Sequence, residues 1–161
     1  MAITRAKKEV ILDKLKSIKK DAKTLVFVGF KGLTVADTYA MRSRLREEGV
    51  GYFVAKKTLM KRVFGEAYEG TMPELDGEVA VAYSEDAIAP AQNVRTFEKQ
   101  FTERVAILGG IFEGVYKDKV AMTEIASIPS LQVLRGMFVN VINSPIQGLV
   151  IALSQVAERK S

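Results

Sequence analysis

The chain has 161 residues and a formal net charge of +5, and it contains neither cysteine nor histidine. The missing cysteine excludes disulfides, a thiol nucleophile and cysteine-bound zinc, and the missing histidine removes the commonest general base and transition-metal ligand. Its 48% hydrophobic content is enough for one ordinary core with an appendage. The first residues carry charges without an apolar stretch of signal-peptide length, so we expect a cytoplasmic protein.

Positive charge is concentrated in the first part of the chain. Residues 1–62 hold 16 lysines and arginines against 6 acidic residues, whereas residues 63–161 hold 8 against 13. Such segregation indicates a polyanionic partner for the first part, or else a set of lysine-rich helices that are simply well solvated.

The first expected element is a helix over residues 4–23, on the outside of a domain. Its apolar residues recur three or four apart along one narrow stripe, formed by Ile11, Leu15, Ile18 and Ala22. Residues 24–30 (TLVFVGF) are β-branched and aromatic, which predicts a strand buried on both faces. A second helix should start at Thr34 with Asp37 in a capping-box-like arrangement and stop at Gly49.

Residues 51–55 predict a second short strand, followed by a short helix that begins near Thr58. The remaining expected elements of this region are a third strand, a helix, a fourth strand bent or bulged by its glycines, and a short helix, over residues 78–83, 87–101, 105–115 and 119–127.

The order of these elements predicts the fold of residues 1–128. Two β-α-β units with an extra helix between them favour an α+β, ferredoxin-like (split βαβ) domain, with a four-stranded sheet and helices on one sheet face. A parallel α/β sheet is the alternative that the pattern leaves open.

The region of residues 129–161 is different, because Arg135 is the only charge between Ser130 and Ala157. We expect a long C-terminal helix that Pro145 kinks or restarts, with Asn143 or Ser144 capping the new start. Its apolar residues form one stripe on each side of the proline: Leu134, Phe138, Val141 and Ile142, then Ile146, Leu149, Val150, Leu153 and Val156.

Four roles compete for this helix: packing on its own domain, docking other chains, forming a homo-oligomer, or spanning a membrane. The last is disfavoured, because polar residues and Pro145 interrupt a run that should be predominantly apolar over about 20 residues. Packing on its own domain is disfavoured as well. A helix of about 30 residues is about 45 Å long, which is longer than a domain of this size can cover. We therefore prefer docking into grooves of other proteins, without a membrane.

The basic half offers several candidate contacts to RNA phosphates. They are Arg5, Lys7, Lys8, Lys31, Gly32, Arg42, Arg46, Lys56, Lys57, Lys61 and Arg62. Gly32 would let the backbone approach a phosphate, and the start of the helix near Thr58 would add free N–H groups. For the arginines of the second helix, pairing with Glu47 and Glu48 is the competing interpretation.

Catalytic signals are lacking. No P-loop occurs, GGIFEG does not match a dinucleotide fingerprint, and no aromatic-rich ribonucleoprotein motif is present. The acidic pair Glu85-Asp86 is explained by helix capping. We expect no enzyme activity, metal, cofactor or small-molecule substrate.

The stretch FKGLTVADTYAMRSRLREEGVGYFVAKKTLMKRV resembles the bacterial large-subunit ribosomal protein L-ten family, the base of the ribosomal stalk. The family's Lys-Gly-Leu-Thr turn, Arg-x-x-Leu-Arg helix and Lys-Asn-Thr-Leu turn correspond to residues 31–34, 42–46 and 56–59. The resemblance covers nearly the whole chain, including the apolar C-terminal helix with its proline. One departure is Lys57, which stands where the family has asparagine and keeps or increases the attraction for phosphate.

The resemblance implies that residues 1–128 bind the GTPase-associated region of large-subunit rRNA, with Thr58 among the contacts, beside ribosomal protein L-eleven. It also implies that residues 129–161 anchor dimers of the acidic stalk protein (L-seven/L-twelve), which recruit translation-factor GTPases. Two apolar segments around Pro145 suggest two dimers. The alternative function is a free-standing RNA-binding translational regulator with an oligomerising C-terminal helix.

Overall fold

The computed structural model describes residues 5–65, 68–101, 104–129 and 131–160. The chain divides into two compact units, Met1–Ile128 and Pro129–Ser161, and each is described by itself.

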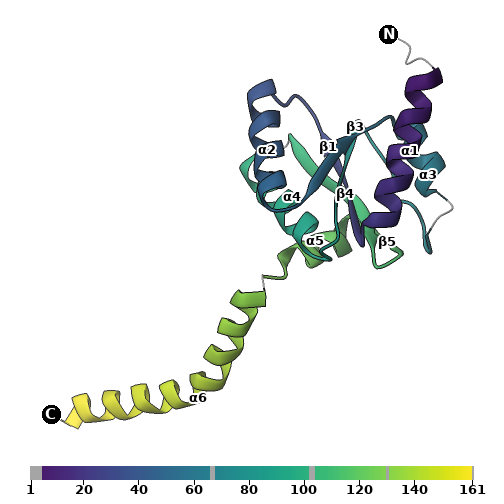
Figure 1. The fold of residues 1–161 in the computed structure, drawn as a ribbon. Helices are drawn as coiled ribbons and strands as arrows, with labels where there is room; N and C mark the ends of the chain where they lie inside the picture. The colour runs from purple at the N-terminus through teal and green to yellow at the C-terminus, as the bar shows by residue number, and fades with distance from the viewer. Residues whose placement is uncertain (1–4, 66–67, 102–103, 130, 161) are drawn as a thin grey trace. The chain divides into compact units, whose positions relative to one another are not determined.

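The first unit is built on one five-stranded sheet (Figure 1). Its strands are β1 (Thr24–Phe30), β2 (Gly51–Val54), β3 (Glu78–Ser84), β4 (Val105–Phe112) and β5 (Val115–Asp118). Its helices are α1 (Arg5–Asp21), α2 (Val35–Glu47), α3 (Lys57–Phe64), α4 (Ala89–Gln100) and α5 (Lys119–Ser127). These bounds agree with the sequence-based expectations to within a few residues, except at the fourth strand.

The strands are arranged in the order β2-β3-β1-β4-β5, and every neighbouring pair is antiparallel. The two strands of the unit β1-α2-β2 therefore flank β3, and the two strands of β3-α4-β4 flank β1, which is the split βαβ order. The parallel α/β alternative is wrong. The predicted strand number is also wrong, because residues 105–115 do not form one strand.

The expected fourth strand ends at Phe112 and turns back into β5. Glu113 and Gly114 both have positive φ, 49° and 83°, as a two-residue type I′ hairpin turn requires. The expected bulge is confirmed: the β1–β4 register shifts between Phe27 and Val28, which leaves Leu108 without a partner opposite β1. A Cβ added at Gly110 would lie 2.4 Å from the carbonyl oxygen of Leu25, so the close approach of β1 and β4 requires a glycine there.

Helices cover both faces of the sheet, so the prediction of helices on one face is wrong. Helices α2, α4 and α5 bury Met41, Leu45, Val94, Phe97 and Met122 against one face, and α1 and α3 bury Leu15, Ile18, Met60 and Phe64 against the other (Figure 1). The reason lies in β1, whose first five residues are all buried. Because successive strand residues point to opposite faces, a strand buried in this way needs a cover on each side.

Local signals set the limits of α2 as expected. The side-chain oxygen of Thr34 accepts a hydrogen bond from the backbone N–H of Asp37 at 3.2 Å, and its hydroxyl donates to the Asp37 carboxylate at 2.7 Å. At the other end Gly49 has φ 69°. The N–H groups of Gly49 and Val50 donate to the carbonyls of Arg46 and Leu45, which is a Schellman motif.

The second unit is one continuous helix, α6 (Leu131–Lys160), with Pro145 inside it. A restart at Pro145 is therefore wrong, whereas Figure 1 shows the helix changing direction about midway along its length, as a proline kink would produce. All described side chains between Gln132 and Arg159 are exposed. By length and composition alone, the segment Gln132–Arg159, with a mean hydropathy of 1.5, could also cross a membrane.

Candidate nucleic-acid interface and docking helix

Two of the candidate basic clusters meet at one end of the sheet. Strands β1 and β2 both run antiparallel to β3, which lies between them, so they finish at the same end. Lys31 follows β1, and Lys56 follows β2. Two strand spacings separate the two turns, which is about 10 Å. We call this region, with the first turns of α3, the basic end.

The start of α3 supplies donors as well as charge. Lys56 is the N-cap residue, and no side chain caps the helix, so its first N–H groups are available to a ligand. Leu59 and Met60 are buried in the core. Lys57, Thr58, Lys61 and Arg62 are exposed.

The turn after β1 is open to solvent. Gly32 has φ 64°, and a Cβ added there would meet no atom within 4 Å. The backbone N–H of Lys31 donates to the carbonyl oxygen of Arg104 at 2.8 Å. Arg104 therefore belongs to the basic end, although sequence reasoning missed it. It stands in the acidic part of the chain, and only the β1–β4 pairing brings it to Lys31.

Negative charge is also present at this end. Arg104 Nη1 lies 4.0 Å from the carboxylate of Asp37, and both side chains are partly exposed. Glu78, at the start of β3, pairs with Phe30 and so stands between the ends of β1 and β2. A polyanion approaching the basic end would have to avoid Glu78, which restricts the path of its phosphates.

The remaining basic candidates lie elsewhere. Lys7 and Lys8 are exposed in the first turns of α1, which packs back along the sheet from the start of β1 and so points these turns toward the basic end. The side chain of Arg5 lies outside the described residues. Arg42 and Arg46 line the length of β2 instead, so the structure does not bring them to the turns at Lys31 and Lys56.

Among the described residues, no arginine of α2 forms the ion pair with Glu47 or Glu48 that the competing interpretation expects. The guanidinium of Arg42 instead lies over the ring of Tyr52, with Cζ 5.5 Å from the ring centroid. Burial raises the pKa of Tyr52 to about 12, although the positive charge of Arg42 acts in the opposite direction.

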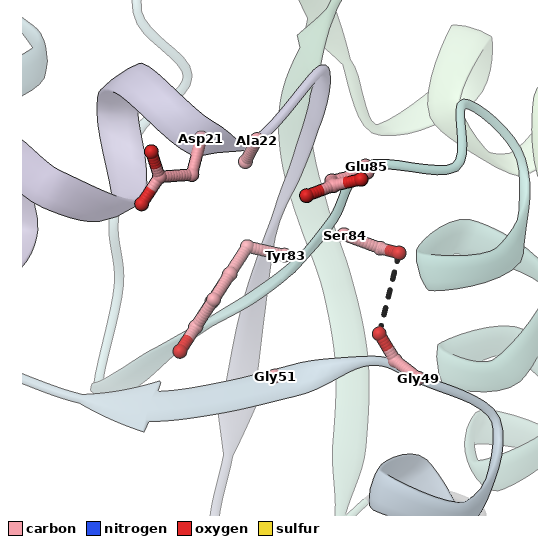
Figure 2. A pocket seen from close by; sticks show the side chains of 7 residues that line it. All are labelled: Asp21, Ala22, Gly49, Gly51, Tyr83, Ser84 and Glu85. Carbon is pink, nitrogen blue, oxygen red and sulfur yellow. Dashed lines mark hydrogen bonds between the residues drawn. The ribbon is translucent and has the colours of Figure 1, made fainter.

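A small pocket of about 360 Å³ lies at the other end of the sheet (Figure 2). Its polar side chains include Asp21 and Glu85, and the hydroxyl of Ser84 donates to the carbonyl oxygen of Gly49 at 3.3 Å. Asp86, beside the pocket, accepts from the N–H of Ile88 at 3.1 Å, in a turn that precedes α4. The N-cap residue of α4 is Ile88, which makes no side-chain cap bond, so the acidic pair does not cap this helix as expected. The described residues contain no cluster that could hold a metal ion.

The predicted docking residues on α6 are all exposed: Leu134, Phe138, Val141, Ile142, Ile146, Leu149, Val150, Leu153 and Val156. Four other large apolar side chains, outside the two predicted stripes, are also exposed on the same helix, namely Val133, Met137, Val139 and Ile151. The helix is thus apolar around most of its circumference. Water is a poor solvent for such a surface, which points to a covering partner.

Comparisons with known proteins agree on one family. Residues 3–99 match the family model described as ribosomal protein L10. The large ribosomal subunit protein uL10 of Delftia acidovorans is 34% identical over 162 residues, covering 100% of this chain and 92% of the relative. The uL10 proteins of Variovorax paradoxus and Pelotomaculum thermopropionicum are 35% and 36% identical, covering 99% and 95% of this chain and 90% and 87% of their own lengths.

Both kinds of comparison extend over the turns after β1 and β2, and the full-length relatives also extend over Arg104 and α6. The chain therefore belongs to the ribosomal protein L10 family (uL10), a family of ribosomal proteins and not of enzymes.

Proposed function

We propose that this chain is a structural protein of the large ribosomal subunit in the cytoplasm, and that it joins rRNA to dimers of the acidic stalk protein. Its full-length relatives are named as large-subunit proteins, which supports the ribosomal assignment. The observation that carries the RNA-binding role is the meeting of the turns after β1 and β2 at one end of the sheet, each with exposed lysine.

The rRNA contacts are made mainly to phosphates. Gly32 exposes backbone beside Lys31, and the uncapped start of α3 presents N–H groups next to Lys57 and Thr58. Oriented N–H groups and lysines together form an anion site without reading bases. Lys56 lies in the turn after β2, Lys61 and Arg62 follow on α3, and Arg104 lies beside Lys31. Lys7 and Lys8 extend the charge along the start of α1.

The rRNA target is the GTPase-associated region, beside ribosomal protein L-eleven, as the family resemblance implies. Lys57 makes a phosphate contact in place of an amide contact. A lysine is a point charge with three rotatable donors, so it tolerates more positions of a phosphate than an asparagine side chain does.

Helix α6 docks two dimers of the acidic stalk protein (L-seven/L-twelve), which recruit translation-factor GTPases. Two apolar segments stand on either side of Pro145, and the bend gives each segment its own axis. A helix laid into a hydrophobic groove is a common mode of protein recognition. Covering these side chains removes from water a surface that would otherwise cause aggregation.

The proposal is tested by reconstituting the purified chain with a transcript of the GTPase-associated region and with the acidic stalk protein. Native mass spectrometry should then find one chain, one RNA and four stalk copies. Six copies would refute the assignment of two dimers. Binding of α6 to vesicles of neutral phospholipid in preference to the stalk protein would refute docking in favour of a membrane role.

A further inference from the structure

A groove of about 870 Å³ runs along the free edge of the sheet. Strand β2 is the outermost strand of the sheet order and pairs with β3 on one side. All four residues of β2 line the groove, together with one face of α2 and Lys14 of α1. An edge strand presents unpaired backbone N–H and C=O groups along its open side. The floor of the groove is therefore a row of backbone donors and acceptors.

Positive charge stands on both sides of this floor. Lys14 Nζ lies 4.9 Å from the ring centroid of Phe53, on the α1 side of the sheet, and Arg42 lies over Tyr52 on the α2 side. Arg46 follows Arg42 by one helical turn. The groove lining contains these three cations and no acidic residue.

We propose that this groove binds an extended acidic segment of a protein partner, which adds to the sheet as a strand beside β2. A helix facing an edge strand across a groove is the arrangement in which peptides are bound by strand addition. The side chains of an added strand would alternate between the two faces. One set would therefore meet Lys14 and the other Arg42 and Arg46, so acidic residues are favoured on both faces of the peptide.

Single-stranded RNA fits the groove less well. Binding of unpaired bases usually relies on aromatic rings with an open face for stacking. The rings of Tyr52 and Phe53 are half-buried, and each is already covered by a cation. The unpaired backbone of β2 also matches a peptide, which carries both donors and acceptors at the spacing of a strand.

Fluorescence anisotropy with the purified full chain tests the proposal. The probe is a labelled peptide, Val-Glu-Glu-Val-Val-Glu-Glu-Val, whose paired glutamates place one carboxylate on each face in either register. Substituting Lys14, Arg42 and Arg46 by Gln should weaken its binding about tenfold, since three charge pairs are lost. The matched control substitutes Lys16, Lys20 and Arg44 by Gln, which removes the same charge from α1 and α2 outside the groove and should leave binding unchanged.

A second peptide separates strand addition from simple charge attraction and needs only the wild-type chain. N-methylation of its two central amides removes one donor from each edge while keeping every carboxylate, and it should abolish binding. Hydrogen exchange should slow at β2 when the unmethylated peptide is present. Equal binding of both peptides, or equal weakening by the two triple variants, would overturn the proposal. Displacement of the peptide by an eight-nucleotide uridine RNA at a lower concentration than unlabelled peptide would assign the groove to RNA.

Discussion

The backbone N–H of Lys31 donates a hydrogen bond to the carbonyl oxygen of Arg104, with 2.8 Å between nitrogen and oxygen. This bond closes the end of the β1–β4 pair, in which Phe30 is paired with Val105. It joins the most basic part of the chain to a cation from the acidic part. The proposed rRNA site is therefore a product of the sheet order, because residues 31, 56 and 104 meet where their strands begin or end.

Removing the charge of α3 should weaken rRNA binding and its dependence on salt. We expect that changing Lys56, Lys57, Lys61 and Arg62 to Ala lowers the affinity for rRNA. The slope of log binding constant against log salt concentration should become shallower by about three, because fewer phosphates are neutralised and binding therefore releases fewer counterions. Filter binding to the GTPase-associated transcript between about 50 and 200 mM salt measures this. All four side chains are exposed, so folding should be retained.

A matched variant keeps this experiment specific. The control changes four other exposed residues to Ala, namely Lys16, Lys20, Lys23 and Arg44. It removes the same number of positive charges, but from positions outside the basic end. The slope should then change much less than in the α3 variant. An unchanged slope in the α3 variant would remove these residues from the site.

Arg104 should contribute one phosphate contact that the sequence alone does not reveal. We expect Arg104→Ala to reduce rRNA affinity severalfold and the salt slope by slightly less than one. Lys119→Ala is the control, because Lys119 is exposed at the start of α5 and carries the same charge. If both variants behave like the wild type, the Asp37 carboxylate already neutralises Arg104 and the residue has no role in RNA binding.

Features that depend on residues close together in the sequence could be predicted, whereas features that depend on the order of strands in the sheet could not. The limits of α2 follow from Thr34, Asp37 and Gly49, which act within a few residues of themselves, and α5 follows from its own pattern and the cap at Asp118. Arg104 and the β2 edge groove depend on which strands become neighbours, and no single stretch carries that information. The helices on both faces were foreseeable from β1, whose apolar residues alternate toward two cores.

The hairpin at the end of β4 shows a different limit. Residues 105–115 look like one apolar strand, since Glu113 is the only charge among them. The turn depends on positive φ at Glu113, which is uncommon outside glycine, asparagine and aspartate. The usual sequence signal for this turn is asparagine or aspartate followed by glycine, and Glu113-Gly114 resembles it only in its second residue.

Gly110 should be intolerant of a side chain. A Cβ there would lie 2.4 Å from the Leu25 carbonyl oxygen and 2.9 Å from Met122 Cε. We expect Gly110→Ala to lower the free energy of unfolding by about 3 kcal/mol, because neither the neighbouring strand nor the core can yield without strain. Urea denaturation measures the loss. Gly136→Ala, where a Cβ would meet no atom within 4 Å, should leave the unfolding of the first unit unchanged.

The phenol of Tyr52 should make the first unit sensitive to alkali. Its pKa in the folded chain is about 12, against the ordinary value of 10.0, because burial disfavours the charged form. Because the folded chain holds the phenol proton more tightly than the unfolded chain does, Tyr52 contributes to the free energy of unfolding. This contribution is complete below pH 10 and is lost as the pH rises toward 12. We expect Tyr52→Phe to reduce the decline in unfolding free energy over this interval by about 1–2 kcal/mol. Urea unfolding of both chains at several pH values measures the difference, and identical declines would contradict it.

Shortening α6 should remove one of the two proposed docking segments. A chain that ends at Asn143 loses Ile146, Leu149, Val150, Leu153 and Val156 but keeps the segment before Pro145. We expect native mass spectrometry to find two stalk copies instead of four, with rRNA affinity unchanged, because the described side chains of α6 are exposed and the first unit has its own two cores.

A chain that ends at Ala157 is the control, since it keeps every docking side chain and should retain four copies. Unfolding of the first unit in the shorter chain would show that α6 belongs to the core of the protein. Loss of all four copies would show that the two segments bind as one.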